Sequence, residues 1–95
     1  MDLHGLRRQI DGIDDELIRL FQQRMDISAK IAQYKRQHNI LVYDPERERQ
    51  KLDELTRKVE NDRAPYVAAL FSLLFELSRA EQEKILSPES TLGAQ

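Results

Sequence analysis

Four polar side chains stand where the periodicity of the sequence calls for apolar ones. Before residue 37, apolar residues recur every three or four positions. Between Leu20 and Ile27 this spacing calls for one more apolar residue, and the sequence has Arg24 there. Lys35 follows eleven residues later, about 20° away on a helical wheel. Ser78 and Gln82, four residues apart, continue an apolar stripe that begins at Val67. The pattern predicts a polar cluster on the inward faces of helices.

Two carboxylates extend this cluster to the middle of the chain. Leu52 belongs to a weaker apolar stripe in the middle of the chain. Glu48 and Asp44 stand four and eight residues before it, on about the same face of a helix. Burying an unpaired charge is costly unless a partner compensates it. If Asp44 serves as the cap of its helix, the cations Arg24 and Lys35 face one acid, Glu48, and leave a positive excess. This excess indicates an anionic ligand with more than one negative group.

Each of these positions also has an ordinary structural explanation. Arg24 can extend out of an apolar seam, or it can be the one polar core residue that sets the register. Ser78 and Gln82 can be satisfied polar residues of a core, Asp44 can be a helix cap, and Glu48 can be one acid of a charged helix. These explanations weaken because the residues lie on inward faces of three different segments.

Covalent and metal chemistry have no motif in the sequence. There is no cysteine, no His-Glu-x-x-His, no glycine-rich phosphate loop and no cluster with metal-ligand spacing. Neither His4 nor His38 lies on an apolar stripe, so we expect both at the surface. An enzyme with this sequence would act by positioning and electrostatics, with no metal.

Prolines and capping residues divide the chain into three expected helices. Pro45 and Pro65 stand where helices can begin, and Asp2 and Asp44 are suitable N-caps. Asn39 is a suitable stop, because asparagine tolerates the left-handed conformation that closes helices. The expected helices are residues 2–37, 45–61 and 65–86. We therefore expect an all-α domain over 1–86 and a frayed C-terminal tail over 87–95.

The first expected helix is too long for a compact chain of 95 residues. Its 36 residues make a rod of about 54 Å, whereas a compact globule of this length is about 32 Å across. Its apolar seam alternates steps of three and four, as in a coiled coil: Leu3, Leu6, Ile10, Ile13, Leu17, Leu20, Ile27, Ile31 and Tyr34. A second chain pairing along this seam would cover it, so the sequence predicts an all-α dimer.

Composition excludes several other classes of protein. Fifteen Lys and Arg against seventeen Asp and Glu give a net charge of -2, which argues against a general nucleic-acid binder. The longest mainly apolar stretch, residues 66–75, is too short to cross a bilayer. The N-terminus lacks the basic and apolar regions of a secretory signal. We expect a small soluble cytoplasmic domain without nucleic-acid or membrane partners.

In combination, these features resemble the all-helical chorismate mutases. The apolar spacing and Arg7 within residues 6–17, followed by Arg24 and Lys35, are similar to that family's first helix. Residues 42–48, Val-Tyr-Asp-Pro-Glu-Arg-Glu, are similar to its loop-to-second-helix motif, V-x-D-x-x-R-E. Each motif alone is common, but their order and spacing are specific.

The resemblance runs from about residue 3 to residue 86, because Ser78 and Gln82 stand where the family places its third-helix pair. It implies an intertwined homodimer of three-helix protomers with two active sites, each built from both chains. It also implies the Claisen rearrangement of chorismate to prephenate in phenylalanine or tyrosine biosynthesis, a reaction that needs no cofactor.

The resemblance assigns three arginines to the carboxylates of the substrate: Arg7, Arg24 and Arg47. Arg7 lies seventeen residues before Arg24 and points about 100° away from it on the wheel. One helix cannot easily aim both at one ligand, and in the family the partner chain supplies the first arginine. Arg47 is off the apolar stripe, so an ordinary surface role remains an alternative.

The remaining roles concern the reacting atoms and the ring. The resemblance implies that Lys35 and Gln82 donate hydrogen bonds to the ether oxygen, and that Lys35 also helps to hold a carboxylate. Asp44 and Glu48 would meet the ring hydroxyl region. Ser78 would support a substrate carboxylate.

Two alternatives to a mutase remain open. Isochorismate pyruvate-lyase shares the fold and the arginine–lysine framework, but that enzyme lacks acids equivalent to Asp44 and Glu48. A non-catalytic helical dimerisation or regulatory module would account for the seam. It would leave Arg24, Lys35 and Gln82 unexplained.

Overall fold

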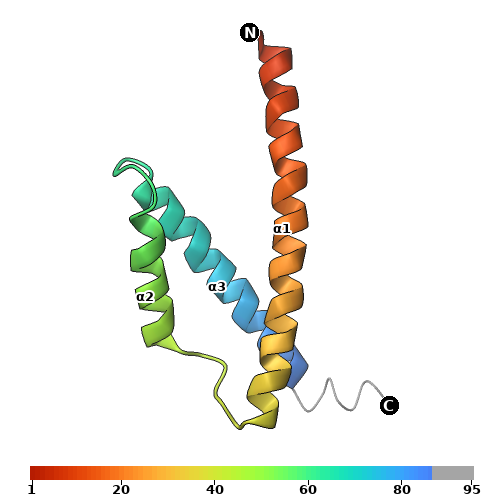
Figure 1. Cartoon of the computed structure of the whole chain (residues 1–95), viewed down its shortest axis with the longest axis vertical. Coiled ribbons are helices and arrows are strands. Elements are labelled where there is room, and N and C mark those ends of the chain that lie inside the picture. Colours follow the sequence, from red (N-terminus) through yellow and green to blue (C-terminus); the bar gives the residue numbers. More distant parts are fainter. Residues whose placement is uncertain (87–95) are drawn as a thin grey trace.

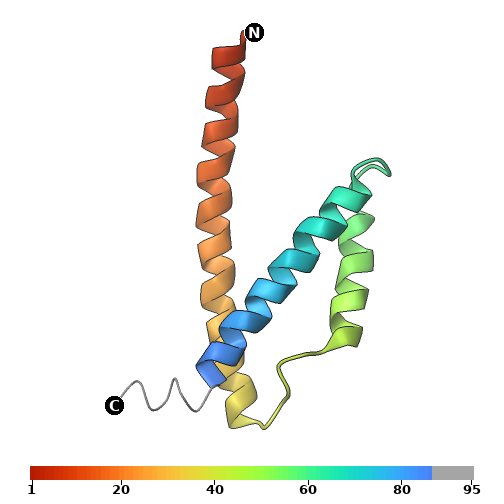
Figure 2. The same ribbon diagram turned by 180° about the vertical axis from the view of Figure 1, so that it is seen from behind.

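The computed structural model describes residues 1–86, which form three helices and no strand. They are α1 (Leu3–Gln37), α2 (Pro45–Thr56) and α3 (Ala64–Leu86). Figure 1 shows α2 and α3 as a hairpin, with α3 crossing the C-terminal half of α1. The same crossing is seen from behind in Figure 2, where the N-terminal end of α1 projects beyond the hairpin. The all-α prediction is confirmed for these residues, and the expected tail, 87–95, lies outside them.

Capping residues set the ends of α1 as predicted. The side chain of Asp2 accepts a hydrogen bond from the backbone N–H of Gly5 at 2.6 Å, which satisfies one of the free donors of the first turn. At the other end, Asn39 adopts a positive φ of 55°, the left-handed conformation that terminates a helix. The resulting helix has 35 residues.

The second helix is shorter than predicted, because it ends at Thr56 and not near residue 61. The Thr56 hydroxyl donates to the carbonyl of Asp53 at 3.1 Å, and that carbonyl would otherwise serve the N–H of Arg57. The Arg57 N–H bonds to Leu55 instead, which tightens the chain into turns. Glu60 then accepts from the N–H groups at the start of α3, so the two helices form a tight hairpin.

A single chain encloses very little core. Among the apolar residues of 1–86, only Ala32 and Val42 are buried. The radius of gyration is 17.1 Å and the longest dimension 54 Å, against about 12 Å for the radius of gyration of a compact chain of this length. The buried residues of α1 are Ser28 and Ala32, so the face that meets α3 lies beside the predicted seam. Seam residues from Leu6 to Tyr34 stay 40% to 60% exposed.

None of the helices within residues 1–86 is both long enough and apolar enough to cross a membrane.

Candidate active site

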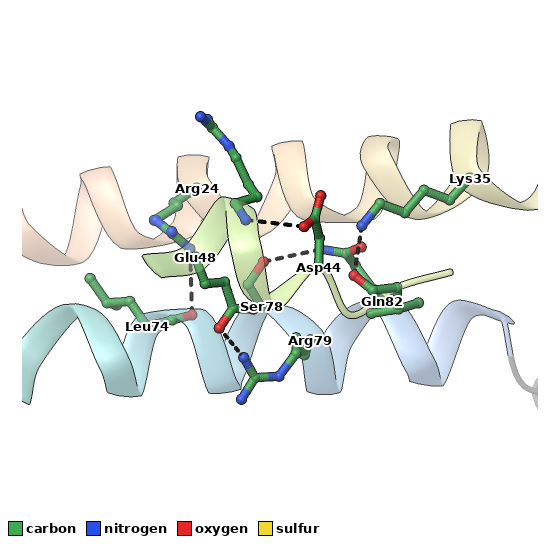
Figure 3. A network of polar contacts seen from close by, with 10 residues as sticks. Arg24, Lys35, Asp44, Glu48, Leu74, Ser78, Arg79 and Gln82 are labelled. Atoms are coloured by element: carbon green, nitrogen blue, oxygen red, sulfur yellow. Dashed lines mark hydrogen bonds and ion pairs between the residues drawn. The ribbon is translucent and has the colours of Figure 1, made fainter. Parts of the chain in front are cut away.

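A pocket of about 420 Å³ draws its lining from all three helices and from the loop before α2. Seven of the eight site residues predicted from the sequence line it: Arg24, Lys35, Asp44, Arg47, Glu48, Ser78 and Gln82. Figure 3 shows how side chains from α1 and α3 approach one another across this space, with the start of α2 between them. The structure thus brings together residues up to 58 positions apart, Arg24 and Gln82.

The two cationic residues that α1 contributes to the pocket each donate a hydrogen bond to a backbone carbonyl. Arg24 donates through Nη1 to the carbonyl of Leu74 at 3.4 Å, and its guanidinium lies 5.8 Å from the ring centroid of Phe75. Lys35 donates through Nζ to the carbonyl of Val42 at 2.7 Å, which ties the loop to α1. A guanidinium has five N–H donors and an ammonium three, so both residues keep donors for a ligand.

A short hydrogen-bond chain connects α1 with the polar residues of α3. The hydroxyl oxygens of Ser28 and Ser78 lie 2.5 Å apart, and Gln82 donates through Nε2 to Ser78 Oγ at 3.3 Å. Gln82 is only 6% exposed, and within residues 1–86 its buried Oε1 has no hydrogen-bond partner. An unsatisfied buried acceptor is costly, and such a group is typical of a site that a ligand, water or another chain completes.

The start of α2 contributes a cap, a cation and an acid. Asp44 accepts a hydrogen bond from the N–H of Arg47 at 3.0 Å, so its capping role is confirmed, and it lines the pocket as well. Arg47 lines the pocket with an exposed side chain, which is compatible with either of its two interpretations. Glu48 is half-buried and forms an ion pair with Arg79 of α3.

The prediction from sequence missed two polar residues that line the pocket, Lys51 and Arg79, and it missed Ser28, which contacts the pocket residue Ser78. Ser28 is buried against Ser78, and its position four residues after Arg24 is the signal that could have found it. Lys51 lines the pocket one turn beyond Arg47. For Arg79 no spacing in the sequence shows that it meets Glu48, because the partner lies on another helix.

Arg7 is the predicted residue that the structure does not bring to this pocket. It is exposed near the start of α1, seventeen residues before Arg24, which is about 25 Å along the helix axis. Supply of this arginine by a partner chain stays a prediction.

The charges in the pocket favour an anion. Two carboxylates, Asp44 and Glu48, line it together with five cationic side chains: Arg24, Lys35, Arg47, Lys51 and Arg79. Opposite charges attract most strongly where water is partly excluded. Within residues 1–86, no three acidic, histidine or cysteine side chains gather closely enough to hold a metal ion.

Comparison with known proteins points to one family. Residues 6–83 match the family model described as chorismate mutase type II. The bifunctional chorismate mutase/prephenate dehydratase of Buchnera aphidicola subsp. Acyrthosiphon pisum is 37% identical over 82 residues, which cover 84% of this chain and 21% of that protein. The T-protein of Haemophilus influenzae is 38% identical over 68 residues, 72% of this chain and 18% of that protein.

A shorter relative matches over most of both chains. The chorismate mutase of Methanocaldococcus jannaschii is 30% identical over 86 residues, which cover 88% of this chain and 87% of that protein. The aligned part of this chain therefore spans about a fifth of the two longer relatives and most of this one. No solved structure gives a significant match.

Proposed function

Because the chain belongs to the chorismate mutase type II family, we propose that it rearranges chorismate to prephenate without a cofactor. The observation that carries this proposal is the single pocket that unites Lys35 and Gln82 with an excess of cations. We propose residues 1–86 as the catalytic domain, acting in the cytoplasm in aromatic amino acid biosynthesis.

The proposed substrate is a dianion, and the arginines would hold its two carboxylates. Arg24 and Arg47 line the pocket within one chain, and Arg7 would come from the partner, with Ser78 supporting a carboxylate. A flexible enolpyruvyl side chain must fold over its ring before it can react. Fixing both carboxylates removes unproductive conformers and so lowers the entropic part of the barrier.

The proposed catalytic groups are hydrogen-bond donors to the ether oxygen. Charge develops on this oxygen as the carbon–oxygen bond breaks, and a preorganised donor contributes ~3–4 kcal/mol there. Lys35 uses one of its three donors on Val42, and Gln82 uses one of its two Nε2 protons on Ser78. Each therefore retains a proton for the substrate. Asp44 and Glu48 would accept hydrogen bonds in the ring hydroxyl region.

We further propose that the working form is an intertwined homodimer. The exposed seam of α1 and the small core of one chain both support it, since burial of apolar surface is the main driving force for such association. The N-terminal end of α1 projects beyond the hairpin in Figure 1 and is free to lie against a second chain. A two-fold axis would then bring each Arg7 to the partner's pocket.

A direct assay tests the proposed activity. The purified protein is mixed with chorismate or with isochorismate, and the products are identified. We expect prephenate from chorismate, and we expect Lys35→Ala to reduce kcat by about 100-fold or more. Lys30→Ala, which removes an exposed lysine of the same helix, is the matched control and should leave kcat unchanged.

Other outcomes would assign other functions. Release of pyruvate from isochorismate, with chorismate untouched, would identify a lyase. No product from a folded dimer would favour a non-catalytic dimerisation or regulatory module. Unchanged turnover in Lys35→Ala would contradict the proposed mechanism.

A further inference from the structure

Arg79 connects three parts of the chain beside the pocket. It follows Ser78 on α3, and its Nη1 donates to Oε1 of Glu48 on α2. Its guanidinium also lies 4.7 Å from the ring centroid of Tyr43, in the loop that leads into α2. Figure 3 shows the guanidinium of Arg79 directed at the Glu48 carboxylate, at the edge of the space between α1 and α3.

The ion pair between Arg79 and Glu48 is less exposed to solvent than an ion pair on the open surface of α2. The side chains of Arg79 and Glu48 are 31% and 24% exposed, whereas those of Arg49 and Glu46, three residues apart on α2, are 69% and 60% exposed. Water screens a sheltered pair less, and its partners are held more firmly.

The surroundings keep Arg79 in place. The Arg79 guanidinium is cationic throughout the working range of pH, as any arginine is, and the hydrogen bond to Glu48 raises its pKa further. The flat guanidinium over Tyr43 adds a cation–π attraction. Loss of Arg79 would therefore free both the loop and the carboxylate.

The pair occupies one oxygen of Glu48 and leaves the other open. Oε1 accepts from Arg79, while within residues 1–86 no hydrogen bond reaches Oε2. Because Glu48 lines the pocket, Oε2 is available to accept a hydrogen bond from a ligand there.

We propose that Arg79 is a positioning residue, which orients Glu48 so that Oε2 accepts a hydrogen bond from the hydroxyl of the bound substrate. This inference rests on the proposed function, in which Glu48 meets the ring hydroxyl. Arg79 acts through Glu48 and does not itself contact the substrate.

A double-mutant cycle separates this role from direct binding. A hydrogen bond present in both the bound and the transition state affects KM more than kcat, so Arg79→Met should raise KM about tenfold with kcat within about twofold of wild type. In a Glu48→Ala background, the same substitution should change KM by less than about twofold, because Arg79 has nothing left to orient. Arg79→Lys, which keeps the charge but loses the flat guanidinium that lies over Tyr43, should give an intermediate KM.

A matched control removes an arginine from the exposed pair. Arg49→Met breaks an ion pair on the same helix, one residue beyond Glu48, and should leave KM and kcat unchanged. An equal loss from Arg79→Met in the wild-type and Glu48→Ala backgrounds would show direct contact with the substrate and overturn the proposal.

Amide hydrogen exchange gives a readout that does not depend on turnover. In the intact protein, Arg79→Met should speed exchange in residues 43–48 and leave residues 25–35 of α1 unchanged, with the far-UV circular dichroism of wild type. If the wild-type protein does not convert chorismate but Arg79→Met still speeds exchange, the proposed function is overturned. The role of Arg79 in holding residues 43–48 is then supported. Unchanged exchange and unchanged KM in an active enzyme would overturn the role of Arg79 and leave the proposed function standing. If Arg79→Met does not fold, the same measurements on Arg79→Lys decide the matter.

Discussion

The hydroxyl oxygens of Ser28 and Ser78 lie 2.5 Å apart and join the long helix α1 to α3. Ser28 is 2% exposed, whereas Ser78 is partly exposed and lines the pocket. Ser78 Oγ also accepts from Gln82, which leaves its own proton available for Ser28. The orientation of the Gln82 amide therefore depends on a residue of another helix.

Removal of the Ser28 hydroxyl should weaken both the fold and the site. We expect Ser28→Ala to cost about 1 kcal/mol in the free energy of unfolding, the usual contribution of one hydrogen bond. We also expect a lower kcat, since the Ser78–Gln82 pair loses its anchor on α1. Thermal unfolding and steady-state kinetics measure the two effects. Ser72→Ala, at an exposed position of α3, is the control. A Ser28→Ala variant with wild-type kcat would show that Ser28 contributes to packing and not to the orientation of Gln82.

The residue type at position 82 should set the pH range of activity. An amide donates a hydrogen bond at every pH, whereas a carboxyl donates only when protonated. Gln82 is buried, and burial raises the pKa of a carboxyl placed there because the charged form is disfavoured.

Wild-type activity should therefore persist at neutral and mildly alkaline pH. Gln82→Glu should be active at acid pH and lose activity as pH rises through the carboxyl pKa. A profile of kcat against pH tests this expectation, with Gln33→Glu, an exposed position of α1, as the control. An unchanged profile in Gln82→Glu would contradict the donor role.

A charge in the seam of α1 should separate the proposed dimer. Ile13 is 60% exposed in the single chain and lies in the N-terminal half of α1. In a dimer it would be covered, and burying a charge there without a partner is costly. We expect Ile13→Glu to shift the sedimentation equilibrium from dimer to monomer and to abolish turnover. Gln22→Glu adds the same charge at an exposed polar position and should stay dimeric. A wild-type monomer with full activity would contradict the shared site.

Local patterns in the sequence predicted α1 and α3 to within one residue at each end, because caps and prolines act on their immediate neighbours. The end of α2 was predicted too late. Val59 continues the helical spacing, but the Thr56 hydroxyl competes for the carbonyl of Asp53 that the next turn would use. Competition of this kind between a side chain and the backbone leaves no trace in hydrophobic periodicity.

Periodicity alone could predict the pocket only where polar residues stand on an apolar stripe, whereas Arg47 came from the family resemblance. Arg24, Lys35 and Gln82 stand on such stripes, and they line the pocket. Ser28 escaped notice because a small residue fits an inward face without disturbing the pattern. Arg79 was missed because its partner Glu48 lies 31 residues away on another helix. The spacing of residues within one helix does not predict which side chains of two helices meet.

Arg7 provides the sharpest test of whether two chains share one site. We expect Arg7→Ala and Lys35→Ala homodimers to be nearly inactive, since each defect then falls in both sites. In a heterodimer with one Arg7→Ala chain and one Lys35→Ala chain, a site built from both chains gathers the two defects into one pocket and leaves the other intact. The purified heterodimer, isolated with two different affinity tags, should therefore show about half the wild-type kcat per dimer. If Arg7 served the pocket of its own chain, every site would carry one defect and no activity would return. The same measurement with Arg8→Ala, a neighbouring exposed arginine, in place of Arg7→Ala should leave that homodimer active, which separates the role of Arg7 from a general loss of positive charge.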